Sequence, residues 1–334
     1  MNKISNLPAI TGIDHTLPLD GCPLPGGKAR VNILALGDVG ITMLIGLRLL
    51  GADVIESIGI CDLNKENCDR LEIEMNQIRY PFPYENPGAG QDLPPVEVIT
   101  EDKLFLGDIV IFCASKGVPQ IGFRGDVRMA QLEANRGIIR HFGKLAHNAD
   151  FKGLMCIVSD PVDPLCAAFL DASGCKPWQV QGYGLGVMNA RACYYAERDE
   201  RFARYLKDGR AFGPHGQDLV IADSLTDYND DISKELTELT VAANTKVREL
   251  GFKPYFAPAL SSAALSVLLT LRGEWHYGSV YLGDEFYGAY FGVRNRITEK
   301  GIEFEDPDLP DALYERIITA YRHLCALRGG KTCC

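Results

Sequence analysis

The run VNILALGDVGITMLIGLRLL at residues 31–50 decides the fold of this 334-residue chain. Its first residues, VNILAL, form the apolar run that is typical of a strand buried on both faces of a parallel sheet. A glycine-containing turn follows, and residues 41–51 then show the pattern of an amphipathic helix. A second apolar run, SIGICDLN, occupies residues 57–64. Strand, tight turn, helix and strand in this order predict a βαβ unit.

The same alternation continues along the first half of the chain. A helix is predicted over residues 64–79, then a Pro-rich connection over 80–95 and a strand at 96–100. Two more buried strands are predicted at 107–115 and 153–160, with a helix over 128–147 between them. Such repetition predicts an α/β fold with a Rossmann-type doubly wound parallel sheet and helices on both faces.

Beyond residue 180 the pattern changes to that of an α+β domain. Because 334 residues exceed the usual size of a single core, two sub-domains are expected. We predict an irregular arm over 1–28, a dinucleotide-binding domain over 29–178 and an α+β catalytic domain over 179–334, with the transition near 160–182. In the second half, helices are predicted over 188–207, 232–250, 257–271 and 311–327, and strands over 219–224, 279–283 and 290–295.

Charge limits the classes of partner. The 34 basic and 44 acidic residues give a net charge of -10, which disfavours binding to nucleic acid or to an anionic membrane. An anionic substrate would therefore need local arginines. We find no secretory signal and no apolar run long enough to cross a bilayer, so a cytoplasmic protein is expected.

The 11 cysteines do not form a CxxC pattern. Cys61, Cys113 and Cys156 stand in apolar, strand-like runs, where a thiol behaves as a small hydrophobic group. A reducing cytosol argues against a disulfide framework, and no metal site is predicted. The terminal pair Cys333 and Cys334 is interpreted as a frayed tail, with a lipidation signal as the alternative.

The first turn, ALGDVG at residues 35–40, matches G-x-G-x-x-G except that its first glycine is Ala35. Gly37 would let the backbone approach a pyrophosphate, and Gly40 would let helix and strand pack closely. Asp38 and Val39 lie at the helix N-terminus, whose free N–H groups favour phosphates. Tight turns between strand and helix also carry glycines for steric reasons alone.

The second strand ends at Asp62, about 20 residues downstream, as the dinucleotide-binding pattern requires. A carboxylate at this position accepts hydrogen bonds from a ribose diol and repels a 2'-phosphate, which favours NAD over NADP. The alternative is that Asp62 only caps the following helix.

Seven segments together resemble one family. In order they resemble the marker segments of the L-lactate and L-malate dehydrogenases, and the likeness extends from about residue 30 to residue 327. The segments are VNILALGDVGITMLIGL, ICDLN, DIVIFCASKGVPQ, VSDPVDPL, GYGLGVMNARACYYA, GPHGQDLV and YFAPALSSAA.

This resemblance implies residue roles. His215 in GPHG corresponds to the proton donor to the substrate carbonyl, a role that suits the pKa of imidazole. Arg191 corresponds to the arginine that binds the substrate carboxylate as a two-pronged fork. Arg128 corresponds to the mobile-loop arginine that polarises the carbonyl, and Asn135 to the asparagine near the carbonyl oxygen. Ala114 and Asp160 join Gly37, Asp38, Val39, Gly40, Asp62 and Asn135 as expected cofactor-binding residues.

Each role has a plainer alternative. His215 could be a turn histidine, Arg191 a surface charge and Arg128 a helix-terminal residue without a ligand. A chance occurrence of all three is disfavoured, because the three residues fall on elements that converge at the carboxyl ends of the strands, where ligands bind in such folds.

Two positions depart from the family pattern. Met188 replaces the carboxylate that holds the catalytic imidazole, so His215 should be a weaker base unless Asp163 or Asp218 substitutes. We therefore expect keto-acid reduction to decline at a lower pH than usual. Asp160 replaces an asparagine near the nicotinamide. It could stabilise an oxidised ring, act as a compensating acid, or only end its strand by bonding to its own turn.

The loop after Pro119 carries the expected specificity residues. Gln120 matches the lactate-type choice, whereas Arg124 in the same loop could meet a second carboxylate. Its length and glycines predict a lid that excludes water on closing.

The sequence thus predicts an NAD-dependent oxidoreductase that interconverts a 2-keto acid and an L-2-hydroxy acid. The alternatives are a non-catalytic NAD-binding protein of the same fold and a dehydrogenase for a bulkier, substituted hydroxy acid. Apolar helix surface predicts a homodimer or homotetramer, with the N-terminal arm crossing to a neighbour.

Overall fold

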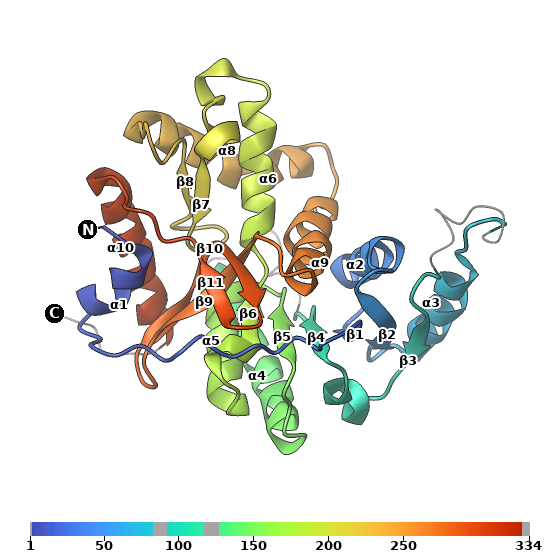
Figure 1. The fold of residues 1–334 in the computed structure, drawn as a ribbon. Helices are drawn as coiled ribbons and strands as arrows, with labels where there is room; N and C mark the ends of the chain where they lie inside the picture. The colour runs from blue at the N-terminus through green and yellow to red at the C-terminus, as the bar shows by residue number, and fades with distance from the viewer. Residues whose placement is uncertain (1, 83–91, 117–126, 329–334) are drawn as a thin grey trace.

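A nine-stranded sheet forms the centre of the molecule, in the order β11-β10-β9-β6-β5-β4-β1-β2-β3 (Figure 1). The structure is a computed structural model. It describes residues 2–82, 92–116 and 127–328, and for residues 127–130 it describes the backbone alone.

Six parallel strands make the half of the sheet that the opening stretch predicts. Their order, 3-2-1-4-5-6, is that of two βαβαβ units joined at a switch point between β1 and β4. The Rossmann-type doubly wound sheet is therefore confirmed. The strands are β1 (Ala29–Leu34), β2 (Ile55–Cys61), β3 (Val96–Val98), β4 (Ile109–Phe112), β5 (Leu154–Ile157) and β6 (Val180–Gly182).

Helices cover both faces of this half, which is why its strands are apolar on both sides. Successive residues of β4 belong to different core clusters, Ile111 to one and Phe112 to the other. Side chains of α2 (Asp38–Leu50) and α9 (Leu265–Leu271) pack into the first cluster, and those of α4 (Val127–Asn148) and α5 (Val162–Ser173) into the second. Helix α3 (Lys65–Gln77) lies beside β3.

The second half extends the same sheet through antiparallel strands. β9 joins β6 at a single pairing, Gly182 with Ser279, and β10 and β11 follow. The predicted strands at 219–224, 279–283 and 290–295 and the helices at 232–250, 257–271 and 311–327 all correspond to elements, the helix at 257–271 beginning with a π-helical segment, η5. These elements are β8 (Val220–Ala222), α8 (Asp230–Glu249), η5 (Pro258–Ala264) with α9, β9 (His276–Gly283), β10 (Gly288–Thr298) and α10 (Asp311–Arg328). Two further strands, β7 (Arg210–Phe212) and β11 (Gly301–Phe304), were not predicted, and β7 pairs with β8 in a separate two-stranded sheet.

The N-terminal arm lies on its own chain rather than reaching away from it. Ile4 and Leu7, in the short helices η1 (Ile4–Asn6) and α1 (Leu7–Ile10), are fully buried. Asn2 donates a hydrogen bond of 2.6 Å to Asp311 at the start of α10. Residues 11–28 then cross the sheet toward β1 (Figure 1). Residues 2–28 thus pack on their own chain, and a contact of this arm with a neighbouring subunit stays a prediction.

Two helices differ from the sequence-based expectation. α5 was not predicted, because ten of its twelve residues are buried and no polar stripe marks a helical period. The helix predicted over 188–207 is instead α6 (Leu185–Ala196), followed by η4 (Glu200–Phe202) and α7 (Tyr205–Asp208). Asp199 accepts a hydrogen bond from the backbone N–H of Arg201, which starts a new turn and interrupts the longer helix.

All nine cysteines in the described part of the chain are free thiols, and Cys61 and Cys156 are buried as predicted. Cys333 and Cys334 lie outside the described residues. No helix within the described ranges combines the length and the apolar character that a membrane crossing requires.

Candidate functional site

The glycine turn between β1 and α2 has the shape that its sequence pattern predicts. A Cβ atom on Gly40 would lie 2.1 Å from the carbonyl oxygen of Ala35, so only glycine fits there. Around Gly37, by contrast, a Cβ would meet nothing within 4 Å, which leaves the backbone open to the space in front of the turn. Ala35, where the pattern has glycine, adopts a left-handed φ of 73°. The turn is therefore conserved in shape although one glycine is missing.

Asp62 at the end of β2 holds this turn. Its carboxylate accepts a 2.6 Å hydrogen bond from the N–H of Leu36 and a 2.8 Å bond from that of Asn64. The residue that caps α3 is Asn64, whose side chain accepts from Asn67. Asp62 is thus not the N-cap of α3. Each carboxylate oxygen can accept a further hydrogen bond, and Asp62 lines the cavity described next.

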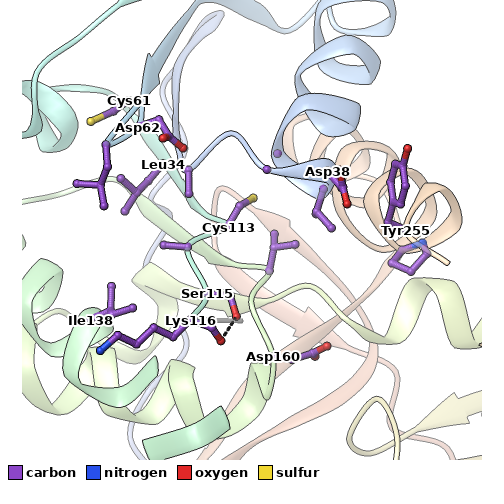
Figure 2. A pocket seen from close by; sticks show the side chains of 18 of the residues that line it. Leu34, Asp38, Cys61, Asp62, Cys113, Ser115, Lys116, Ile138, Asp160 and Tyr255 are labelled. Atoms are coloured by element: carbon purple, nitrogen blue, oxygen red, sulfur yellow. Dashed lines mark hydrogen bonds between the residues drawn. The ribbon is translucent and has the colours of Figure 1, made fainter. Parts of the chain in front are cut away.

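A cavity of about 1530 Å³ extends from the turn along the carboxyl ends of the strands, the place where ligands bind in doubly wound folds. Figure 2 shows Asp62 on one side of it, Asp38 and Tyr255 on the other, and Asp160 below them. Lys253 contacts Asp38 at 3.1 Å across its mouth. Seven of the eight residues predicted to bind a cofactor line this cavity: Gly37, Asp38, Val39, Gly40, Asp62, Ala114 and Asp160.

Asn135 is the exception. It is fully buried and lines neither this cavity nor the one described next, among the residues that the structure describes. Its amide oxygen accepts from the N–H of Lys116 at 2.8 Å, and its amide nitrogen donates to the carbonyl of Asp160 at 2.7 Å. Asn135 therefore supports the backbone behind the site, whereas the sequence predicted contact with cofactor and substrate.

A second cavity, of about 540 Å³, meets the first at Asp160, His215 and Asn244, which line both. Arg191 and Met188 of α6 also line it. The structure thus brings His215 and Arg191, predicted as catalytic and carboxylate-binding residues, to one cavity that adjoins the predicted dinucleotide site.

His215 has a carboxylate partner after all. Nδ1 of His215 lies 3.0 Å from Oδ1 of Asp160, and the ring packs against Gly184, where a Cβ would approach it to 3.0 Å. Burial lowers the pKa of His215, but the charge and hydrogen bond of Asp160 raise it by more, so that it lies above its usual value. The expectation of a weaker base at His215 is therefore wrong, because Asp160 compensates for Met188.

The two acids named as substitutes have other contacts. Asp163 is buried and accepts a 2.5 Å hydrogen bond from Ser279, and burial raises its pKa to about 7. Asp218 contacts Nδ1 of His323 on α10 at 3.0 Å. Asp163 adds only a longer-range charge at His215, and Asp160 is the direct partner.

Arg191 is a buried cation, with 9% of its surface exposed. Its guanidinium donates to Sδ of Met188 at 3.6 Å and to the amide oxygen of Asn244. Within the described part of the chain it forms no ion pair, and burial lowers its pKa. A buried guanidinium without a carboxylate is costly unless an anion compensates it. Its place in the cavity wall agrees with the predicted role of Arg191 in binding an anion.

Three predicted residues cannot be placed by their side chains. Arg128 lies in the first turn of α4, and only its backbone is described. Gln120 and Arg124 lie outside the described residues.

Asn244 is a site residue that the sequence did not reveal. The helix over 232–250 was predicted, but its amphipathic pattern does not show that Asn244 faces Arg191. Only the packing of α8 against α6 brings these two side chains together.

Comparison with known proteins supports the family resemblance. No protein-family model matches the chain. The L-lactate dehydrogenase of Treponema denticola is 30% identical over 199 residues, which is 60% of this chain and 58% of that protein. The L-lactate dehydrogenase of Mesomycoplasma hyopneumoniae is 24% identical over 193 residues, 58% of this chain and 57% of its own length. The matches thus span less than two thirds of these relatives.

Solved structures show the same fold over nearly the whole chain. The ligand-bound minor L-lactate dehydrogenase of Enterococcus mundtii superposes with a TM-score of 0.72 at 19% identity, covering 90% of this chain and 98% of its own. Malate dehydrogenase of Archaeoglobus fulgidus in complex with NADH gives 0.71 at 18% identity, with the same coverage. This chain is thus similar in sequence to L-lactate dehydrogenases over part of its length, and it has the fold of lactate and malate dehydrogenases over nearly all of it.

Proposed function

We propose that this protein is an NAD-dependent 2-hydroxyacid dehydrogenase that interconverts a 2-keto acid and an L-2-hydroxy acid. The observation that carries the proposal is the junction of the two cavities. His215, paired with Asp160, and the buried Arg191 face one space that opens onto the glycine turn. A proton donor and a carboxylate-binding cation beside a dinucleotide site are the groups that such a reaction needs.

The residues around the larger cavity fit NAD. Gly37 leaves the N-terminus of α2 accessible, where free N–H groups favour a pyrophosphate. Asp62 would accept hydrogen bonds from a ribose diol, and its charge disfavours a 2'-phosphate. When bound, the nicotinamide would supply or accept the hydride. Asp160 and His215 would lie at its end of the cavity, since both line the junction.

The chain's own groups bind the substrate and hold the proton. Arg191 binds the carboxylate of the 2-keto acid, and Asn244, which already accepts from Arg191, limits the position of the guanidinium. Protonated His215 donates to the carbonyl oxygen during reduction and takes the proton back during oxidation. Asp160 raises the pKa of His215 and orients its ring.

The test is NADH absorbance in the presence of a panel of 2-keto acids. Turnover of at least one of them, lost in His215→Asn with NADH binding retained, supports the proposal. Tight NADH binding without turnover of any keto acid would instead favour the non-catalytic NAD-binding alternative. The pairing of Asp160 with His215 at 3.0 Å favours a catalytic protein over this alternative.

We also propose that the protein is a homo-oligomer. Ile45, Leu49 and Leu50 expose apolar surface on α2, and Leu250 and Phe252 after α8 are 75% and 70% exposed. Exposed apolar residues in such number favour a protein–protein contact. Light scattering coupled to size-exclusion chromatography tests this, and a monomer at micromolar concentration would contradict it.

A further inference from the structure

We propose that the substrate is a 2-keto acid with a branched, uncharged side chain, rather than pyruvate or a dicarboxylate. This inference rests on the proposed dehydrogenase function and concerns the part of the 540 Å³ cavity that lies beyond His215 and Arg191. A cavity of that size is in the range that holds ligands of drug-like size, about 300–1,000 Å³. The keto-acid head alone needs only a small part of it.

The direction of the side chain follows from the junction of the cavities. Asp160, His215 and Asn244 lie where the two cavities meet, so the reacting carbonyl belongs there. With the carboxylate on Arg191, the rest of the substrate extends toward α4, α8 and α10. Each of these helices supplies an aliphatic side chain to the wall: Leu132, Val241, Leu324 and Leu327.

The charges of this wall disfavour a second carboxylate. Arg191 is the only arginine or lysine among the described residues that line the cavity, and it is needed for the first carboxylate. His323 already contacts Asp218 at 3.0 Å. Asp160, Asp163 and Asp218 also line the cavity, so among the described lining residues an anionic side chain would meet carboxylates rather than a free cation. An uncharged aliphatic group needs no second cation and is not repelled by these carboxylates.

Two keto acids of almost the same shape separate the possibilities. In 4-methyl-2-oxopentanoate an isopropyl group stands where oxaloacetate has its second carboxylate. Each buried CH₂ group favours binding about fourfold, so the three carbons that distinguish the branched acid from pyruvate favour it up to about 60-fold. We expect kcat/KM for the branched acid to exceed that for pyruvate and for oxaloacetate at least tenfold.

A substitution in the wall tests the location. Val241 on α8 is 40% exposed, so Val241→Lys places a cation at the wall without burying it. We expect the ratio of kcat/KM for 4-methyl-2-oxopentanoate over oxaloacetate to fall at least tenfold. Val247→Lys is the matched control, because Val247 lies on the same helix, is 37% exposed and lines neither cavity. It should leave the ratio unchanged.

The outcomes separate this inference from the proposed function. Preference for pyruvate or oxaloacetate would overturn the inference and leave the dehydrogenase intact. An equal change of the kcat/KM ratio in Val241→Lys and Val247→Lys would also overturn the inference and leave the dehydrogenase intact. Failure to reduce any 2-keto acid, with NADH bound, would overturn both.

Discussion

Replacing Asp160 with asparagine should lower the pKa of His215 and thereby shift the pH dependence of catalysis. Asparagine keeps the shape and a hydrogen-bonding oxygen but removes the charge that lies 3.0 Å from Nδ1 of His215. A close carboxylate raises the pKa of a partner by about 1 to 3 units. Because the side chain of Asp160 is 50% exposed, solvent screens part of its charge, and we expect a shift of about 1 unit.

The sign follows from the role of the ring. Reduction needs protonated His215, so its kcat/KM declines as pH rises through the raised pKa of this residue. In Asp160→Asn the midpoint of that decline should move down by about 1 unit, which corresponds to about tenfold lower activity above both midpoints. Below both midpoints the kcat/KM of the variant should fall much less relative to the wild type. Oxidation of the hydroxy acid, which needs neutral His215, should extend to lower pH.

The assay is NADH absorbance across pH, with kcat/KM fitted for each variant. Asp218→Asn is the control, because it removes a carboxylate near the same loop that contacts His323 rather than His215. Its midpoint should equal that of the wild type. An unchanged midpoint in Asp160→Asn, or a loss that is equal at every pH, would refute the account of Asp160 as the partner of His215.

Two further predictions concern stability. Burial raises the pKa of Asp163 to about 7 from an ordinary 3.8, so its contribution to the free energy of unfolding is complete below about pH 4 and is lost as pH rises through 7. At pH 8 the free energy of unfolding of Asp163→Asn, measured by urea denaturation, should therefore exceed that of the wild type by up to about 4 kcal/mol, with little difference at pH 4. Parallel pH profiles of the two proteins would contradict this. Ala35→Gly removes a left-handed alanine but frees the unfolded chain, so we expect between about 0 and 1 kcal/mol of stabilisation in the same assay, and a clear destabilisation would show that the φ of 73° is not strained.

The first half of the fold was predictable because its signals are local. Parallel strands covered on both faces are mainly apolar, and β4 and β5 are wholly apolar in sequence, whereas β1 and β2 are apolar over most of their length. Helix α5 gave no such signal, since a helix buried on nearly every side has no polar face to reveal its period. The βαβ connections predicted a doubly wound parallel sheet without fixing its strand order, and the joining of β9 to β6 depends on one distant pairing.

The site was predictable in its residues but not in their partners. The glycine turn, Asp62, Arg191 and His215 stand in recognisable segments, and all of them line the two cavities. The pairing of His215 with Asp160 joins two loops from different parts of the chain, and it depends on how the loop around Gly213 and Gly216 turns through positive φ. Sequence spacing cannot show that one acid has taken over where another is missing.

The central claim is that His215 and Arg191 act together on one organic anion beside bound NADH. The most direct measurement is the rate of NADH oxidation with 4-methyl-2-oxopentanoate and with pyruvate, for the wild type, His215→Asn and Arg191→Lys, with NADH affinity followed by fluorescence. The account predicts turnover by the wild type, a loss of about 10²- to 10⁴-fold in kcat for His215→Asn, and a raised KM for Arg191→Lys, with NADH affinity unchanged in both. Full activity in either variant, or no turnover of any 2-keto acid by a wild type that binds NADH, would contradict it.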